Sequence, residues 1–260
     1  MELGLEGKVA LVTGASRGIG RGIALAFAKE GCHLMLTARD VKALDEVAET
    51  IRGNGRRTAV SVLDLREPKA PAAVIDQVKR EFGGLDILIN NAGTTKRGDF
   101  AALTDEDWAD GFALKFFAHM RLARAAWPLL KERKGALVAI GGTSGRKPEK
   151  RFTIGSSVNA AVAAFTKCLA DLGKDDGVRV NCIHPSLVET ERQWRRIRAA
   201  VAETGEPEDK VRAVLCRETG ITRFGTVDDV ADLVTFMVSA RATWLQGATV
   251  DLDGGEIPVL

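Results

Sequence analysis

The sequence predicts an α/β protein, a doubly wound parallel sheet of about seven strands with helices on both faces. Short β-rich apolar runs alternate with helical patterns along most of the chain, which is typical of repeated β-α-β units. The length of 260 residues suits one large domain of this kind. Because such crossovers are right-handed, the doubly wound sheet is the simplest topology.

Each strand is predicted from a short apolar run. The predicted strands are Lys8–Thr13, His33–Thr37, Thr58–Leu63, Leu85–Asn90, Ala136–Ile140, Val178–Ile183 and Thr249–Leu252. Helical patterns lie between them, for example Gly18–Glu30, Pro71–Phe82, Asp105–Lys131 and Ser156–Leu172. No internal repeat, low-complexity segment or linker divides residues 1–260, so we expect a single domain.

The longest departure from this alternation is the segment 189–223, between the sixth and seventh predicted strands. Trp194, Ile197, Val201 and Ala202 recur there at helical spacing. Gly205-Glu206-Pro207 then interrupts the pattern. We expect this segment to form a helical substrate lid.

The composition excludes several classes of function. A hydrophobic content of 45% with 28% charged residues is ordinary for a globular protein. The net charge of +2 is too small to indicate a nucleic-acid partner. The chain shows neither a signal peptide nor a membrane span, and its cysteines, Cys32, Cys168, Cys182 and Cys216, lack the paired spacing of metal ligands. We expect a cytoplasmic protein with buried, reduced thiols.

A glycine-rich loop, Thr13-Gly14-Ala15-Ser16-Arg17-Gly18-Ile19-Gly20, joins the first predicted strand to the first helix. Its glycines allow the backbone to turn sharply and to approach a pyrophosphate, and the helix N-terminus offers free N–H donors. Three glycines alone are weak support, but the strand–turn–helix context is what such a motif requires. The loop therefore predicts a nucleotide site that uses Gly14, Ser16, Arg17, Gly18, Ile19 and Gly20.

Four further motifs follow in order along the chain: Asp64-Leu65, Asn90-Asn91-Ala92-Gly93, the stretch Asn181–Thr190 and Asp251-Leu252-Asp253-Gly254-Gly255. Together with the glycine loop they resemble the motifs of the short-chain dehydrogenase/reductase family, over nearly the whole chain. The resemblance implies a Rossmann fold and a nicotinamide cofactor. It places Asp64 and Leu65 at the adenine, Asn91, Ala92 and Gly93 beside the adenosine ribose, and Pro185 and Thr190 at the nicotinamide. Ser186 stands where the family usually has glycine.

The end of the second strand indicates which nicotinamide cofactor is used. Enzymes that use NAD typically present an acid there to the ribose 2′-hydroxyl, but this chain has Ala38 followed by Arg39. Arg17 would point into the same pocket, and two guanidinium groups suit a 2′-phosphate. The cofactor is therefore predicted to be NADP. Asp40 as a ribose ligand, or arginines that are merely solvated, are the alternatives.

The acid–base residues of the family are replaced. Members usually combine an Asn, a Ser, a Tyr and a Lys four residues after the Tyr. The matching positions here are Lys115, Gly142, Gly155 and Asn159, and the chain contains no tyrosine at all. Lys115 and Asn159 look like an exchange of the usual Asn and Lys between their two helices, so we expect an ammonium and an amide in one small volume. The alternatives are a structural pairing of the two residues or a solvent-exposed Lys115.

The missing proton donor has several candidates. Thr143 and Ser144 follow the fifth strand and offer hydroxyl groups, and Lys115 could act as the acid in a dry pocket. Ser156 and Ser157 turn away from the helix face of position 155, so an N-cap role for one of them is expected instead. His184 is interpreted as a packing residue. The predicted catalytic set is Lys115, Asn159 and Ser144.

The loops after strands four, five and six are basic. They carry Lys96, Arg97, Arg146, Lys147, Lys150, Arg151, Arg192, Arg195, Arg196 and Arg198, against Asp99, Glu149, Glu189 and Glu191. Such a rim would attract an anionic small-molecule substrate, unless the lid arginines form only a solvated face. We expect an NADP(H)-dependent oxidoreductase that acts on a carbonyl or alcohol. A non-catalytic dinucleotide-binding protein, or a lyase or isomerase, are the alternatives. Family resemblance implies a homotetramer or homodimer.

Overall fold

The computed structural model describes residues 2–258 and contains one seven-stranded parallel sheet. The strand order is β3-β2-β1-β4-β5-β6-β7. The strands are β1 (Val9–Thr13), β2 (His33–Ala38), β3 (Thr58–Val62), β4 (Ile87–Asn90), β5 (Ala136–Ile140), β6 (Arg179–Pro185) and β7 (Thr249–Leu252). The predicted fold class is confirmed, and every predicted strand is present within two residues of its expected bounds.

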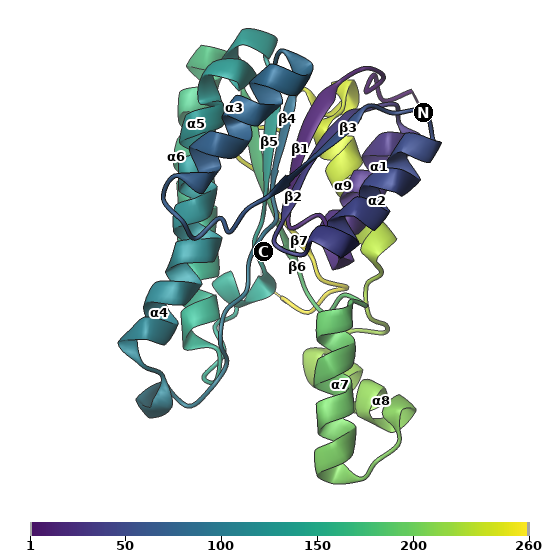
Figure 1. Cartoon of the computed structure of the whole chain (residues 1–260). Helices are drawn as coiled ribbons and strands as arrows, with labels where there is room; N and C mark the ends of the chain where they lie inside the picture. The colour runs from purple at the N-terminus through teal and green to yellow at the C-terminus, as the bar shows by residue number, and fades with distance from the viewer. Residues whose placement is uncertain (1, 259–260) are drawn as a thin grey trace.

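Helices cover both faces of the sheet (Figure 1). One layer is α1 (Gly18–Lys29), α2 (Val41–Gly53) and α9 (Val227–Val238), and the other is α3 (Ala70–Phe82), α4 (Asp105–Phe112), α5 (Ala118–Arg133) and α6 (Thr153–Asp176). Alternate side chains of a strand pack against opposite helix layers. In β1, Ala10 and Val12 pack against the first layer, and Val9 and Leu11 pack against the second. Two apolar cores therefore hold the carboxyl ends of the strands at one common edge.

The predicted helix Asp105–Lys131 is interrupted. Thr104 and Asp107 form a capping box at the start of α4, and the chain then passes through a π-helical turn, Ala113–Phe117, before α5 begins. An extra residue per turn re-aims the side chains that follow, and such turns are frequent at functional sites. Lys115 lies within this turn.

Two sequence interpretations are wrong. Helix α6 begins at Thr153, and Ser156 lies inside it with its hydroxyl accepting from the Glu149 backbone N–H at 3.2 Å, so neither Ser156 nor Ser157 is the N-cap. Phe152 is therefore the N-cap residue, and it has no side-chain cap bond. Cys168 is exposed and Cys216 is half-buried, while Cys32 and Cys182 are buried.

Within residues 2–258, no helix combines the length and the apolar character that spanning a membrane requires.

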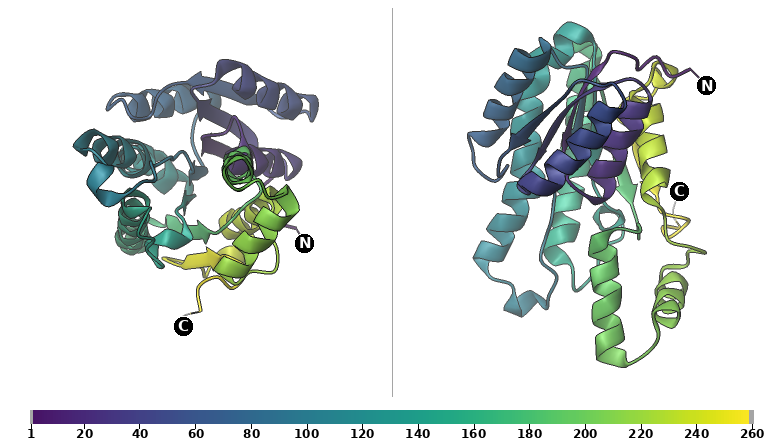
Figure 2. Two further views of the ribbon diagram at one scale, coloured as in Figure 1. Left: turned by 90° about the horizontal axis from the view of Figure 1, so that it is seen from below. Right: turned by 45° about the vertical axis from the view of Figure 1, so that its right-hand side comes forward.

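The segment after β6 forms an arm of two helices, α7 (Glu191–Thr204) and α8 (Glu208–Thr219). Figures 1 and 2 show the arm projecting beyond the carboxyl edge of the sheet. Ile197, Val211, Ile221 and Phe224 form a small apolar core of its own. A bridge between Val188 and Gly225 closes its base. The position of the arm fits the predicted lid, whose closing function stays a prediction.

Candidate active site

The glycine loop makes a tight turn between β1 and α1. Gly14 and Gly18 adopt left-handed φ values of 65° and 55°, which favour glycine. A Cβ atom on Gly20 would overlap the Gly14 carbonyl and lie 2.5 Å from Asn91 Nδ2. No side chain caps the start of α1 and no acidic residue lies in its first turn. The N–H groups of this turn are therefore free of side-chain partners, as an anion site requires.

The loop after β4 is held against the glycine turn by Thr13. The Thr13 hydroxyl accepts from the backbone N–H groups of Asn91 and Ala92, both at 2.9 Å, and donates to Ile89. The Asn91 amide donates to the Thr13 carbonyl at 2.8 Å. These bonds bring the predicted residues Asn91 and Ala92 next to Gly14. Two distant motifs thus form one edge of the site.

His119 supports the same loop from behind, and sequence reasoning missed it. Its Nε2 lies 2.9 Å from the Ala92 carbonyl oxygen. Burial lowers the pKa of His119 to about 4, so the ring is neutral at physiological pH. A neutral imidazole donates this bond without bringing a charge into the site.

The two arginines predicted to bind the 2′-phosphate lie on separate segments, Arg17 in the glycine loop and Arg39 directly after β2. Arg17 and Arg39 are exposed, and the Arg39 guanidinium lies 3.5 Å from the Asp64 carboxylate. The Asp40 carboxylate accepts from the Ala43 N–H at 3.1 Å and caps α2. This carboxylate therefore already has a structural role. Leu65 is buried with its side chain in the core, so it can offer a ligand only its backbone.

The loop after β6 closes over the glycine turn. Pro185 is buried at the end of β6. Thr190 caps α7 by accepting from the Gln193 N–H at 3.4 Å. A Cβ atom on Gly18 would lie 3.4 Å from the Thr190 methyl group. Gly18 at the start of α1 and Thr190 at the start of α7 therefore lie side by side.

Lys115 extends between the ends of β4 and β5. Its ammonium donates to the Gly141 carbonyl at 3.0 Å, and its Cδ would lie 2.9 Å from a Cβ atom on Gly93. Burial of the ammonium, then repulsion by Arg192, lowers the pKa of Lys115 to about 8. The residue retains some exposure, but its charged end lies among protein atoms. This position agrees with the expectation that Lys115 is not a surface residue.

Asn159 and Ser144 are in direct contact. The buried Asn159 amide donates to the Ser144 hydroxyl at 2.9 Å, and its Oδ1 has no hydrogen-bond partner among the described residues. A Cβ atom on Gly142 would lie 2.9 Å from Asn159 Nδ2. Lys115 therefore reaches Gly141 while Asn159 packs against Gly142. The two side chains meet neighbouring residues of one loop, but no hydrogen bond between them is found in residues 2–258.

Phe152 fills the space beside Gly155. The three atoms nearest to a Cβ on Gly155 are all carbons of the Phe152 ring, and they would overlap it. The Arg97 guanidinium lies 3.9 Å from the centroid of this ring, within cation–π distance. Glu149 holds Arg97 through two bonds, of 2.7 and 3.0 Å. Sequence reasoning missed Phe152, although it stands three residues before Gly155, a spacing at which side chains share a helix face.

His184 packs beneath the loop that carries Gly141. It is fully buried, and its Nδ1 lies 3.3 Å from the Asp251 carboxylate. Burial lowers the pKa of His184, and the carboxylate opposes this shift. A Cβ atom on Gly141 would lie 2.6 Å from the His184 ring. The interpretation of His184 as a packing residue agrees with this position.

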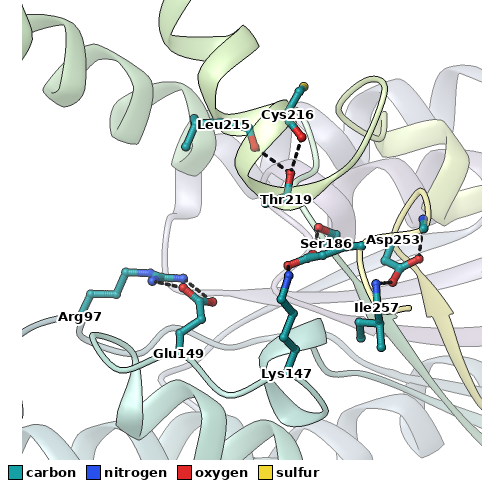
Figure 3. Close-up of polar contacts among 11 residues, drawn as sticks. Arg97, Lys147, Glu149, Ser186, Leu215, Cys216, Thr219, Asp253 and Ile257 are labelled. Carbon is teal, nitrogen blue, oxygen red and sulfur yellow. Dashed lines mark hydrogen bonds and ion pairs between the residues drawn. The ribbon is translucent and has the colours of Figure 1, made fainter. Parts of the chain in front are cut away.

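The mouth of the site is lined by ion pairs. Figure 3 shows the Arg97–Glu149 pair on one side and Lys147 reaching toward the C-terminal segment on the other. Lys147 pairs with Glu256 at 3.5 Å, and the Ser186 hydroxyl also donates to Glu256. The Asp253 carboxylate accepts from the backbone N–H groups of Gly255 and Ile257. The segment after β7 is thereby fixed beside Ser186.

Comparisons with known proteins agree with this geometry. Residues 8–200 match the family model described as short chain dehydrogenase. The chain is 35% identical to an uncharacterized oxidoreductase of Mycobacterium tuberculosis, covering 96% of this chain and 92% of that protein. It is 31% identical to the 3-oxoacyl-[acyl-carrier-protein] reductase FabG of Escherichia coli, covering 97% and 98%.

Solved structures give the same result. L-sorbose reductase from Gluconobacter frateurii, complexed with NADPH and L-sorbose, matches with a TM-score of 0.96, 35% identity and full coverage of both chains. A short chain dehydrogenase from Burkholderia cenocepacia in complex with NADP matches with a TM-score of 0.86 and 32% identity, covering 97% of this chain and 98% of that one.

Proposed function

This chain belongs to the short-chain dehydrogenase family and is an NADP-dependent oxidoreductase, and we propose that it reduces or oxidises a small anionic carbonyl or alcohol substrate. In this proposal Lys115, Asn159 and Ser144 replace the family's usual acid–base residues. The observation that carries it is the desolvated Lys115 ammonium at the ends of β4 and β5.

The residues of the glycine loop and of the loops after β2, β4 and β6 fit the cofactor. The uncapped first turn of α1, with Gly18, Ile19 and Gly20, would bind the diphosphate through backbone N–H groups. Arg17 and Arg39 would bind the 2′-phosphate, and Asp64 would stay beside Arg39. Asn91, Ala92 and Gly93 would flank a ribose, and Pro185 and Thr190 the nicotinamide. When bound, NADPH supplies the hydride for a carbonyl carbon.

Lys115 would supply the proton. An ammonium has three N–H donors, and one of them is used by Gly141. Another can donate to the substrate oxygen, where negative charge develops as the carbon is reduced. The proton passes from Nζ to that oxygen, an alcohol forms, and the neutral amine takes a proton back from water. A pKa of about 8 lies close to physiological pH, which suits a general acid.

Ser144 and Asn159 would position the substrate oxygen. The Ser144 oxygen accepts from Asn159, which leaves its own O–H free to donate. Both side chains are buried, so their orientation is held by packing and they act as fixed donors and acceptors.

The test is NADPH oxidation with a panel of small carbonyl compounds, both anionic and neutral. Loss of a positioned acid typically costs about 10²–10⁴ in rate, so Lys115→Ala should lower kcat by that factor. Lys115→Arg keeps the charge but has no transferable proton at neutral pH, and it should be equally slow. The control is Lys174→Ala, an exposed lysine on α6. Turnover of Lys115→Ala equal to wild type would refute the proposal.

The proposal includes a cytoplasmic location and a homodimer or homotetramer. Phe117, Leu172, Phe236 and Trp244 are large apolar side chains exposed on the single chain, and their burial between copies would account for them. Light scattering coupled to gel filtration measures the assembly. A monomer at micromolar concentration would contradict this part of the proposal.

A further inference from the structure

Charge at the mouth of the site is distributed unevenly. Of the ten basic residues predicted to line it, six have carboxylate partners within ion-pair distance. These pairs are Lys96–Asp107, Arg97–Glu149, Arg146–Asp251, Lys147–Glu256, Arg151–Asp99 and Arg198–Glu191. The loops after β4 and β5 are therefore largely neutralised by the protein itself. In residues 2–258, the basic rim residues without an ion pair are Lys150 and three arginines of α7.

These three arginines share one face of α7. Arg192, Arg195 and Arg196 are spaced three and four residues apart, so they are neighbours on the helix surface. The buried side chain Ile197 points toward the core that α7 forms with α8. Figure 1 shows α8 on one side of α7, with the side toward α4 uncovered. Arg192 lies on the side of α7 that meets the loop after β4, because its guanidinium contacts the Gly93 carbonyl.

One hydrogen bond joins this face to the loop after β4. The Arg192 guanidinium donates to the Gly93 carbonyl at 2.9 Å, and Gly93 also packs against the Lys115 side chain. Burial, and then repulsion by Arg17, Arg195 and Arg97, lowers the pKa of Arg192. Two cations without carboxylate partners thus flank Gly93.

Arg196 follows Arg192 by one turn of α7. Burial, then repulsion by Arg97, lowers the pKa of Arg196. The carboxylates that act on it are Glu149, Glu218 and Glu256. Glu149 is bound to Arg97, and Glu256 to Lys147 and Ser186, so two of the three are already neutralised. The positive charge of Arg192 and Arg196 therefore exceeds the negative charge available to them.

We propose that Arg192 and Arg196 bind a carboxylate or phosphate group of the substrate. This group lies at a distance from the carbonyl that Lys115 protonates. Guanidinium groups bind both anions in bidentate fashion. Arg192 would hold the anion on the Gly93 side and Arg196 one turn further out. The assignment of the anion to a substrate rests on the proposed function. The same chemistry would also suit the cofactor diphosphate, which the experiment separates.

The experiment is calorimetric titration of inorganic phosphate and of malonate into protein saturated with NADP⁺. Wild type, Arg192→Gln, Arg196→Gln and the double variant are compared. Each single change should weaken binding of both probes at least tenfold, and the double change should remove measurable binding. The control is Arg198→Gln, which removes one charge from the same helix, and it should bind like wild type.

Four results would overturn the inference. The first is equal probe binding in all variants, and the second is equal loss in Arg198→Gln. In the third, Arg192→Gln weakens NADP⁺ binding while probe binding to the saturated protein is unchanged, which assigns the anion site to the cofactor diphosphate. Because no turnover is measured, lost probe binding supports the site even if the carbonyl panel shows no activity. Activity without any probe binding would leave the proposed function standing and end this inference.

Discussion

The ring of Phe152 occupies the space that a side chain on Gly155 would need. The family places its tyrosine at this position, so the loss of tyrosine here is coupled to a second residue that fills the gap. Arg97 stacks on the outer face of the ring at 3.9 Å, and Glu149 holds Arg97 in place. The site is therefore repacked around the missing phenol and has not simply lost it.

This relationship predicts how Gly155 responds to substitution. Gly155→Ala should destabilise the fold by about 1–3 kcal/mol, because an added methyl group overpacks the site. Adding Phe152→Ala to this variant should cost less than the sum of the two single changes, since the residues share one volume. Chemical denaturation of the four proteins measures the coupling. Strictly additive effects would show that the two positions are independent.

The same contact bears on restoring the family's residues. Gly155→Tyr with Asn159→Lys should give little gain in carbonyl reduction, because Phe152 blocks the phenol and Lys115 would repel the new ammonium. Adding Phe152→Ala should improve folding of this variant more than its activity. Assays with generic ketones decide the point. A large gain from the first two changes alone would identify the site as a degenerate copy of an ordinary one.

Cofactor preference follows from the exposed Arg17 and Arg39. NADPH should bind at least tenfold more tightly than NADH, which corresponds to about 1.4 kcal/mol and is modest for a charge-assisted phosphate contact. Arg39→Ala should lose most of this preference while leaving NADH binding nearly unchanged. Calorimetry with both cofactors provides the measurement. Equal affinities in the wild type would remove the assignment of these residues.

The pKa of Lys115 predicts a pH-dependent stability. A lysine whose pKa falls to about 8 on folding, from an ordinary 10.5, binds fewer protons when folded than when unfolded between these two values. Wild type should therefore gain stability relative to Lys115→Met as pH rises from about 8 toward 10.5, by on the order of 2 kcal/mol. Below pH 8 the buried cation should make wild type the less stable protein. Thermal unfolding across this range, with the exposed Lys29→Met as control, tests the sign.

The rate should follow the same group. If protonated Lys115 donates the proton, carbonyl reduction should fall as pH rises through about 8, and alcohol oxidation should rise over the same range. Initial rates in both directions give the two profiles. A profile unchanged by Lys115→Ala would assign the titration to another residue.

Local patterns predicted the sheet well, because each strand is a contiguous apolar run and the glycine loop marks β1 and α1. The nucleotide edge was predictable for the same reason. The π-helical turn around Lys115 was not, since one extra residue leaves the apolar spacing nearly unchanged. The partner of Arg146, Asp251, lies 105 residues away, so the charge balance of the rim depends on tertiary packing. The role of Phe152 could have been predicted, because the absence of the tyrosine side chain implies that another side chain fills its space.

In the proposed mechanism, Lys115 is a desolvated acid beside the bound cofactor. NMR titration of protein labelled with ¹³C at lysine Cε, with Lys115→Arg to assign the signal, measures its pKa directly. We expect a pKa near 8 in the free protein. We also expect the Lys115 signal to shift when NADP⁺ is added, while the signal of the exposed Lys174 does not. A Lys115 signal that titrates near the ordinary value of 10.5 and does not shift with NADP⁺ would show that Lys115 is not the acid.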